Sequence, residues 1–300
     1  LSINPGNATL HYGQSIFEGM KAIRAKDGRI TLFRPELNAK RFNESCKRMC
    51  MPQIDEALFI DLIKQHVAFE QNWIPNTDNS SLYIRPFIFA TDDFLGVRPS
   101  ESYKFMILTC PVGAYYSEPV SVKIEEHFTR AAEGGVGRAK TAGNYAASLY
   151  PTKLANDKGF HQLIWTDCKE HKYLEESGTM NLALVIDGVI VTPSEDSDTI
   201  LRSVVKRSVV ELAKHWGLPV EERRISVEEV ILAIREGRLT DAFGAGTAAT
   251  IAPIAKIGYR GEVFELPAVA TRLVSKRIKT YLDDIKSGDC EDELHWCVNI

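Results

Sequence analysis

The sequence predicts an α/β protein of the α+β type, folded as two domains. Its 300 residues suit about two domains of ordinary size. Two pairs of predicted strands are joined by Asp-Gly turns, at Asp27-Gly28 and Asp187-Gly188, which favour antiparallel hairpins. The predicted strands and helices also fail to alternate as a parallel sheet requires. Together these observations favour antiparallel sheets with helices packed beside them.

The composition excludes several classes of protein. Hydrophobic residues make up 44% of the chain and charged residues 25%, as in ordinary globular proteins. The net charge of -4 offers no basic surplus for nucleic acid or for a membrane surface. No apolar run reaches about 18 residues, so no spanning helix is predicted. The six cysteines form no disulfide framework or zinc pattern, so we expect no metal and a cytoplasmic location.

The first part of the chain mixes strands and helices. Four strands are predicted, at residues 22–25, 29–33, 81–91 and 104–112. Two helices are predicted between them, at residues 34–50 and 55–72. We expect Leu58, Leu62 and Phe69 to form the apolar face of the second helix. Pro86 suggests an edge strand or a bulge.

The remainder is expected to form a larger domain. Its predicted strands lie at residues 120–126, 161–167, 173–177 and 181–192. Its predicted helices lie at residues 199–216, 226–237 and 266–287, and Ser226 with Glu229 gives the second a capping box. We therefore expect a small domain over residues 1–113, a linker over 114–119 and a large domain over 120–300. We also expect residues to be missing before Leu1, because the chain has no initiator Met.

The most distinctive segment is EGGVGRAKTAGNYAAS, residues 133–148, in which Lys140 is surrounded by small residues. No acidic residue adjoins this lysine, and its thin surroundings leave room for a large, flat group against the backbone. Two chemistries use such a lysine: a phosphate-binding loop, or a Schiff base with a carbonyl cofactor. A turn with an incidental surface lysine is the third interpretation.

The phosphate-loop interpretation fits the sequence poorly. Gly134–Thr141 nearly matches G-x-x-x-x-G-K-[ST], but Ala139 stands where the second glycine is needed. The nearest candidate acidic partner, Asp187, lies in a predicted hairpin turn. A nucleotide-binding strand leads instead into a loop and a helix.

The Schiff-base interpretation finds further support along the chain. Pyridoxal phosphate needs a lysine, an acid for its ring nitrogen, a donor for its phenolic oxygen and a phosphate cup. Glu175 and Glu176 end a predicted strand, and Tyr145 follows Lys140 by five residues. Phosphate contacts are available from Arg34, from Gly244–Thr247 and from a helix start near residues 199–205.

Eight ordered segments resemble the branched-chain-amino-acid aminotransferases, class IV pyridoxal-phosphate-dependent aminotransferases of fold type IV. The segments are HYGQSIFEGMKA (11–22), LFRPELNAKRF (32–42), SLYIRP (81–86), PVGAYY (111–116), GGVGRAKTAGNYAAS (134–148), EESGTMN (175–181), ILRSVVKRS (200–208) and FGAGTA (243–248). The resemblance covers essentially the whole chain. It implies pyridoxal 5'-phosphate as cofactor, a homodimer, a small α/β domain and a larger domain with an antiparallel, barrel-like sheet.

The resemblance also implies roles for individual residues. Lys140 would be the Schiff-base lysine and proton carrier, Glu176 the partner of the ring nitrogen and Tyr145 that of the phenolic oxygen. The other implied cofactor contacts are Arg34, Thr179, Leu201, Val204, Val205 and Thr247. The implied substrate contacts are Tyr12, Phe17, Tyr83, Arg85, Tyr115, Thr247 and Ala248, with Leu95 and Val97 from a second subunit. Arg85 would meet the side-chain carboxylate of glutamate or 2-oxoglutarate.

The resemblance implies a ping-pong transamination of L-leucine, L-isoleucine and L-valine with 2-oxoglutarate, in branched-chain amino acid biosynthesis. Two enzymes of the same fold stay open as alternatives, D-amino-acid aminotransferase and aminodeoxychorismate lyase. A catalytically silent cofactor-binding protein and a P-loop phosphotransferase are alternatives of other classes. Asp92 and Asp93 precede Leu95, and the sequence assigns them no role.

Overall fold

The computed structural model describes residues 2–77, 79–116 and 118–300. Its chain forms two compact units. Unit 1 comprises Leu1–Ala114, Ala139–Ala146 and Asp283–Ile300, and unit 2 comprises Tyr115–Arg138 and Ala147–Leu282. The predicted domains, residues 1–113 and 120–300 with a linker over 114–119, stay a proposal. Residue 117 of that linker lies outside the described residues. No helix in the described part of the chain is long and apolar enough to cross a membrane.

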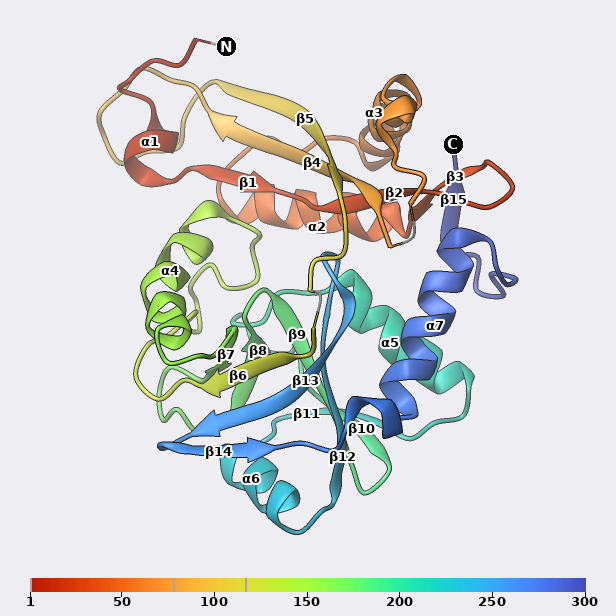
Figure 1. Ribbon diagram of the computed structural model, residues 1–300. Helices are drawn as coiled ribbons and strands as arrows, with labels where there is room; N and C mark the ends of the chain where they lie inside the picture. The colour runs from red at the N-terminus through yellow and green to blue at the C-terminus, as the bar shows by residue number, and fades with distance from the viewer. Residues whose placement is uncertain (1, 78, 117) are drawn as a thin grey trace. The chain divides into compact units, whose positions relative to one another are not determined.

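Unit 1 contains a six-stranded antiparallel sheet (Figure 1). Its strands are β1 (Ser15–Phe17), β2 (Met20–Arg24), β3 (Ile30–Phe33), β4 (Ser81–Ala90), β5 (Tyr103–Val112) and β15 (Cys297–Asn299). β4 pairs with β5 along one side and with β1 and β2 along the other, and β3 and β15 follow β2. The hairpin predicted at Asp27-Gly28 is confirmed, since β2 and β3 are antiparallel and Gly28 has a φ of 89°.

The prediction for Pro86 was wrong, because this residue lies inside the central strand β4. On one side of β4, the strand pairing has a gap at residues 85 and 86. β2 pairs with Leu82–Ile84 before this gap, and β1 pairs with Phe87–Phe89 after it. The Pro86 carbonyl accepts from the Glu18 backbone amide at 2.7 Å in this gap. A residue's N–H and C=O point to the same side of an antiparallel strand. An N–H at position 86 would therefore point into the same gap, so proline at this position removes no hydrogen bond between named strands.

The helices of unit 1 are α1 (Ala8–Tyr12), α2 (Pro35–Arg48), α3 (Glu56–Phe69) and the 3-10 turn η1 (Gln71–Trp73). Of these, α2 and α3 share a hydrophobic core with the sheet. The buried residues of α2 and α3 include Ala39, Phe42, Cys46, Phe59, Ile63 and Val67. The predicted apolar face of α3 was wrong, because Leu58 and Phe69 are 50% and 84% exposed. The buried stripe is shifted to Phe59, Ile63 and Val67.

Unit 2 contains a nine-stranded sheet that closes on itself. Its strands are β6 (Val120–Ile124), β7 (Gln162–Thr166), β8 (Leu174–Ser177), β9 (Met180–Ile186), β10 (Val189–Pro193), β11 (Val220–Arg223), β12 (Leu239–Gly246), β13 (Thr250–Tyr259) and β14 (Glu262–Glu265). The order β9-β12-β13-β6-β7-β8 returns to β9 through the β8–β9 pairing. This closed ring is the predicted barrel-like sheet. The predicted Asp187-Gly188 hairpin is present between β9 and β10.

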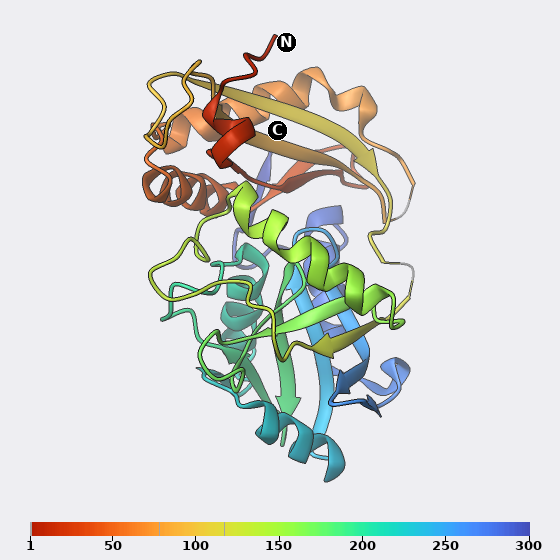
Figure 2. The ribbon, with the colours of Figure 1, turned by 90° about the vertical axis from the view of Figure 1, so that its left-hand side faces the viewer.

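The barrel is not fully antiparallel as predicted. β6 runs parallel to both β13 and β7. Parallel neighbours need a long crossover, and helix α4 (Ala142–Asn156) lies between β6 and β7 in the chain. This helix was not predicted from the sequence, and it is continuous in Figure 2 although it contains Pro151.

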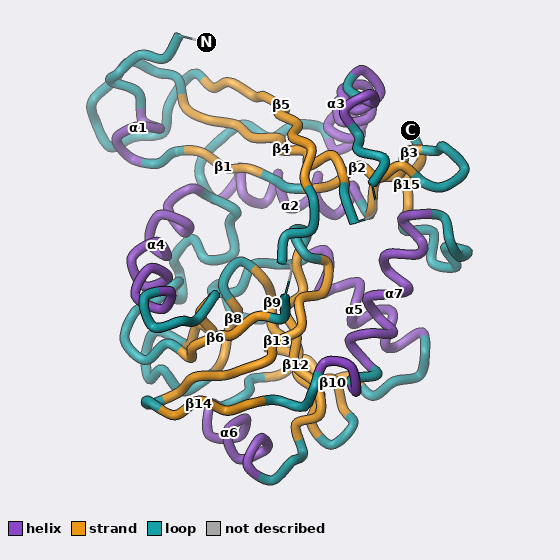
Figure 3. The backbone as a smooth tube through the Cα atoms, in the orientation of Figure 1, coloured by secondary structure: helices purple, strands orange, loops and turns teal. Residues whose placement is uncertain are grey.

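Two further predicted helices begin later than expected. α5 spans Val204–His215, and Ser203 caps it by accepting from the Lys206 amide. Residues 199–203 before it are non-helical, as the loop colour before α5 shows (Figure 3). α7 spans Val274–Ser287 rather than 266–287, because residues 266–273 hold the 3-10 turn η2 (Val269–Thr271). α6 (Val227–Arg235) has the predicted Ser226 cap, which accepts from the Glu229 amide.

Candidate active site

Lys140 lies at the end of a loop, just before α4 begins, and its backbone is fixed within unit 1. Its amide donates to the Ser45 hydroxyl at 2.9 Å, and its carbonyl accepts from the Phe17 amide at 3.0 Å. The neighbouring Thr141 hydroxyl donates to the Ser15 carbonyl at 2.8 Å. These bonds join the lysine backbone to α2 and to β1, so the side chain projects from a rigid base.

The Lys140 side chain meets two aromatic residues. Its Nζ donates to the Tyr145 hydroxyl at 2.7 Å, and the same atom lies 4.9 Å from the centre of the Phe17 ring. The Phe17 and Tyr145 rings are themselves 4.9 Å apart. Tyr145 reaches the lysine because it stands in the first turns of α4. The structure therefore brings together three residues that the sequence assigned to one site.

A buried acid lies beside this cluster. Glu18 is fully buried and accepts from Arg41 at 2.7 and 2.9 Å and from the Asn38 amide at 2.7 Å. Burial alone would raise the pKa of Glu18, but the charge and hydrogen bonds of Arg41, aided by the charge of Lys140, hold that pKa below its usual value. Neither Glu18 nor Arg41 was predicted as a site residue from the sequence, because no spacing pattern indicates this pair.

Arg85 is held among aromatic rings on β4. Its guanidinium lies 4.4 Å from the centre of the Phe17 ring and donates to the Tyr83 hydroxyl at 2.8 Å. A Cβ on Gly19 would lie 2.3 Å from that hydroxyl, so glycine is needed for the close approach. Phe17 contacts both Arg85 and Lys140, and Arg85 contacts Tyr83, so these four side chains form one continuous group in unit 1.

Arg34 occupies a strained position at the start of α2. It has a φ of 47° and is 5% exposed. Its amide donates to the Trp296 carbonyl at 2.8 Å, and its guanidinium stacks 4.7 Å from the centre of the Trp296 ring. Left-handed backbone at a non-glycine residue persists only where the surroundings hold it. Trp296 provides that support.

In unit 2, Glu176 on β8 is a buried carboxylate whose two oxygens are both bound. Oε2 pairs with Nε of Arg130 at 2.8 Å, and Oε1 accepts from the Leu201 amide. The Leu201 carbonyl in turn accepts from the Asn181 side chain at 3.2 Å. Leu201 therefore meets Glu176 through its backbone, from the non-helical segment before α5.

Glu175, next along β8, has different surroundings. Its Oε1 accepts from the Thr199 hydroxyl at 2.6 Å, while its buried Oε2 has no hydrogen-bond partner among the described residues. Burial, with a smaller contribution from the charge of Glu176, raises the pKa of Glu175 to about 7. The two adjacent acids therefore differ in their partners, a charged arginine for Glu176 and a neutral hydroxyl for Glu175.

The remaining predicted cofactor contacts of unit 2 lie at element ends. Val204 and Val205 form the first turn of α5, where backbone amides lack helical partners. Thr179 is exposed in the turn between β8 and β9. Thr247 and Ala248 lie in the turn between β12 and β13, not in a turn formed by Gly244 and Gly246. Those glycines end β12 and lie against Met180, which a Cβ on Gly244 would meet at 2.6 Å.

The glycines before Lys140 serve the local chain path. A Cβ on Gly137 would lie 2.6 Å from the Ala131 Cβ and 2.8 Å from the Asp198 carbonyl oxygen. A Cβ on Gly135 would lie 2.8 Å from the Ala132 carbonyl oxygen. The expectation that small residues make room for a flat group is therefore wrong for these two glycines, which make room for neighbouring backbone.

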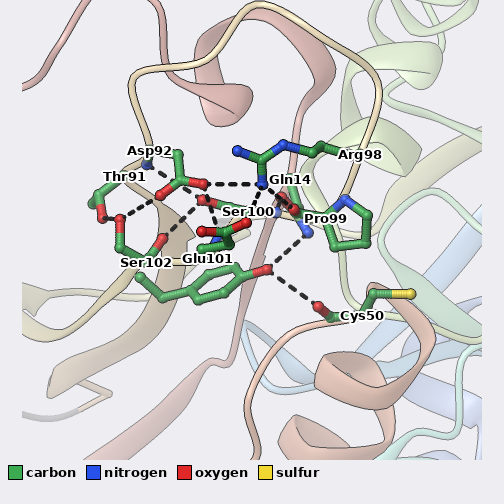
Figure 4. A network of polar contacts seen from close by, with 10 residues as sticks. Gln14, Cys50, Thr91, Asp92, Arg98, Pro99, Ser100, Glu101 and Ser102 are labelled. Carbon is green, nitrogen blue, oxygen red and sulfur yellow. Dashed lines mark hydrogen bonds and ion pairs between the residues drawn. The ribbon is translucent and has the colours of Figure 1, made fainter.

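Leu95 and Val97 lie at the tip of the loop between β4 and β5, and are 68% and 90% exposed. A polar network holds the base of this loop (Figure 4). Asp92 accepts from the Glu101 amide at 2.7 Å and from the Ser102 hydroxyl at 2.8 Å, and pairs with Arg98 at 3.3 Å. Gln14 accepts from the Ser100 amide at 3.1 Å. The aspartate without a predicted role thus braces the loop.

Two predicted substrate residues are partly exposed tyrosines, Tyr12 in unit 1 and Tyr115 in unit 2. Tyr12 on α1 is 44% exposed, and its ring lies 6.1 Å from that of His11. Among the described residues of unit 1, no hydrogen bond or ring contact connects Tyr12 to Lys140. Tyr115 is 55% exposed and packs edge-on against Tyr116 at 4.7 Å.

Comparison with known proteins places this chain in a family. Residues 15–257 match the family described as amino-transferase class IV. The branched-chain-amino-acid aminotransferase 2 of Bacillus subtilis is 46% identical, over 100% of this chain and 83% of its own. The chain belongs to the class IV aminotransferases. Within that family it resembles the branched-chain-amino-acid aminotransferases, as the sequence predicted.

Two further similarities agree with this assignment. The branched-chain-amino-acid transaminase 1 of Bacillus subtilis is 45% identical, over 100% of this chain and 85% of its own. The crystal structure of the Escherichia coli branched-chain amino acid aminotransferase has a TM-score of 0.83 and 26% identity, over 99% of this chain and 93% of that chain. The predicted fold type IV is confirmed.

Class IV aminotransferases use pyridoxal phosphate, so the predicted enzyme class and cofactor are confirmed. The residues of each unit fit the group. Unit 1 supplies a lysine amine beside a tyrosine hydroxyl, and unit 2 a buried, arginine-paired carboxylate. The phosphotransferase alternative is left without support.

Proposed function

We propose that this chain transfers the amino group of L-leucine, L-isoleucine or L-valine to 2-oxoglutarate by a ping-pong mechanism. The contact between Lys140 Nζ and the Tyr145 hydroxyl carries the proposal, because it pairs an amine with a phenol on a fixed backbone. The identity of 46% to an enzyme named for branched-chain amino acids supports the substrate class.

When bound, pyridoxal phosphate supplies an aldehyde for the lysine and a ring that withdraws electrons from the substrate α-carbon. Once the substrate amino group has taken its place on the aldehyde, the released Lys140 amine would take the proton from the α-carbon and deliver it to the C4′ carbon of the cofactor. Its rigid attachment to Ser45 and Phe17 keeps the amine within a narrow range of positions. Tyr145 would hold the phenolic oxygen of the cofactor through its hydroxyl, and Glu176 would hold the ring nitrogen through its carboxylate.

The phosphate is proposed to bind where charge and free amides are available. Arg34 supplies a guanidinium, the first turn of α5 supplies the amides of Val204 and Val205, and Thr247 supplies a hydroxyl. Leu201 and Thr179 complete the proposed cofactor contacts.

The substrate side chain is proposed to bind against Phe17, Tyr83, Tyr12 and Tyr115, and its α-carboxylate at the Thr247–Ala248 turn. Arg85 gives the otherwise apolar surface one cation for the second carboxylate of glutamate. Leu95 and Val97 are proposed to reach a second copy of the chain in a homodimer, since both are exposed on a braced loop. The six free cysteines are compatible with a cytoplasmic location.

Absorbance spectra of the purified, cofactor-loaded protein test this function. Addition of L-leucine is expected to convert the yellow form to the amino form, and 2-oxoglutarate is expected to restore it. Conversion by D-alanine instead would favour a D-amino-acid aminotransferase. Release of p-aminobenzoate from aminodeoxychorismate would favour the lyase, and absence of any conversion a silent binding protein.

A further inference from the structure

Arg130 lies in the loop between β6 and α4, and its side chain is 8% exposed. It uses its guanidinium fork in three directions. Nε pairs with Glu176 at 2.8 Å, Nη1 donates to the Thr199 carbonyl at 2.6 Å, and Nη2 donates to the Gly137 carbonyl at 3.3 Å. The two carbonyl bonds hold the plane of the guanidinium, so its position does not depend on Glu176 alone.

The carboxylate of Glu176 is correspondingly fixed from two sides. Its side chain is 5% exposed, so an unpaired charge there would be strongly disfavoured. Arg130 binds one oxygen and the Leu201 amide the other. Since arginine does not lose its proton in proteins, its charge beside Glu176 favours the carboxylate over the neutral acid.

The neighbouring acid shows what happens without such a partner. Glu175 is also buried, but its closest hydrogen-bond partner is the neutral Thr199 hydroxyl, and its other oxygen has none among the described residues. Two consecutive acids on one strand thus have different partners, a charged one for Glu176 and a neutral one for Glu175. Direct pairing with Arg130 distinguishes Glu176 from Glu175.

The path of the loop between β6 and α4 places Arg130 close to Glu176. Gly137 allows the loop to pass against Asp198 and Thr199, where a Cβ would lie 2.8 Å from the Asp198 carbonyl oxygen. Arg138 binds the same segment through the Glu195 and Ser197 carbonyls. The two arginines therefore share a structural role at residues 195–199, and Arg130 adds the ion pair with Glu176.

We propose that Arg130 is a positioning residue that holds the Glu176 carboxylate in place and in its charged form, so that Glu176 keeps the cofactor ring nitrogen protonated. This inference rests on the proposed role of Glu176 toward that nitrogen. Arg130 itself acts only through Glu176. The electron-withdrawing power of the ring then depends on a side chain that touches neither substrate nor cofactor.

The test follows the ring nitrogen directly. The wild-type protein and the variants Arg130→Met, Arg130→Lys and Arg138→Met are each loaded with pyridoxal phosphate carrying a heavy nitrogen isotope in its ring. The NMR chemical shift of that nitrogen distinguishes its protonated and unprotonated forms, and its midpoint is recorded against pH. Arg138→Met is the matched control, because it weakens the same segment but leaves the Arg130 contact intact.

We expect the midpoint to fall by at least about 1 pH unit in Arg130→Met, because a Glu176 carboxyl that takes up a proton or turns away no longer stabilises the protonated ring nitrogen. Arg130→Lys should lie between Arg130→Met and wild type, because lysine keeps the charge but lacks the fork. Arg138→Met should match wild type. Equal midpoints in Arg130→Met and Arg138→Met would overturn the inference. If Arg130→Met does not fold, a wild-type midpoint in Arg130→Lys would overturn it instead. A wild-type protein that fails to bind the cofactor would contradict the proposed function itself.

Discussion

Arg41 on α2 grips Glu18 with two nitrogens, Nε at 2.7 Å from Oε1 and Nη2 at 2.9 Å from Oε2. Both side chains are almost completely removed from solvent, at 7% and 0% exposure. The pair lies next to the residues that hold Lys140, because Ser45, which binds the lysine amide, also donates to the Arg41 carbonyl at 2.9 Å. A buried charge pair thus lies next to the backbone contacts of Lys140, the proposed catalytic lysine.

Removing one partner of this pair should destabilise the protein strongly. Arg41→Met leaves the Glu18 charge buried without its cation, and such losses amount to about 3 to 5 kcal/mol. Urea unfolding of the cofactor-free protein measures the change. Arg48→Met, at the exposed end of the same helix, is the control and should change stability little. A loss in Arg41→Met no larger than that in Arg48→Met would contradict this account.

Glu175 should make the protein less stable as the pH rises. Its pKa is raised from 4.5 to about 7, so the folded chain holds a proton that the unfolded chain releases earlier. The stabilising effect is complete below about pH 4.5 and disappears as the pH passes about 7, a difference of about 3 kcal/mol. Glu175→Gln should therefore be more stable than wild type at about pH 8 and nearly equal at about pH 5.

Thermal unfolding of the cofactor-free protein at the two pH values measures this difference. Glu170→Gln, in an exposed loop, is the matched control and should follow wild type at both. Parallel pH profiles for Glu175→Gln and wild type would show that Glu175 does not hold a proton in the folded chain.

Arg85 should act on only one of the two half-reactions. Arg85→Ala removes the cation proposed for the second carboxylate of glutamate, so the rate constant kcat/KM should fall about 10- to 100-fold for glutamate and much less for leucine. Tyr83→Phe removes the hydroxyl that accepts from Arg85, and should show a smaller change in the same direction. Single-turnover kinetics of each half-reaction measure both. Equal losses for the two amino acids would indicate that Arg85 is structural.

Asp92 should control the order of the loop that carries Leu95 and Val97. Asp92→Ala removes the acceptor for the Glu101 amide and the Ser102 hydroxyl, so we expect faster hydrogen exchange at residues 91–102 and a higher KM for leucine. Asp93→Ala is the control, because Asp93 makes no hydrogen bond among the described residues. Unchanged exchange in Asp92→Ala would exclude the bracing role.

Two hairpin turns and one helix cap were predicted correctly, because their structure depends on a few neighbouring residues in the sequence. The Asp-Gly turns fixed two hairpins, and the Ser226 cap located the start of α6. Helix α4 was missed because its glycine, its proline and its low amphipathic character do not suggest a helix; it is required by the parallel pairing of β6 and β7. Parallel pairing is a long-range property that the sequence does not display.

The site shows the same division. Lys140, Tyr145, Phe17 and Glu176 were predicted from motifs, and the structure gives each of them a bonded or packed position. Arg130 was not predicted as a site residue. It pairs with Glu176 although the two are about 46 residues apart in the sequence, and no spacing rule connects them. Residues that hold catalytic groups in place are recognised by contact rather than by motif.

The central claim is that Lys140 is the residue that binds the cofactor aldehyde. The loaded protein is treated with borohydride, digested and analysed by peptide mass spectrometry, which identifies the lysine that carries the reduced cofactor. We expect the modification on the peptide containing Lys140, and expect it to be absent from Lys140→Ala. Modification of a different lysine in the wild-type protein, or turnover of leucine with 2-oxoglutarate by Lys140→Ala, would contradict the account.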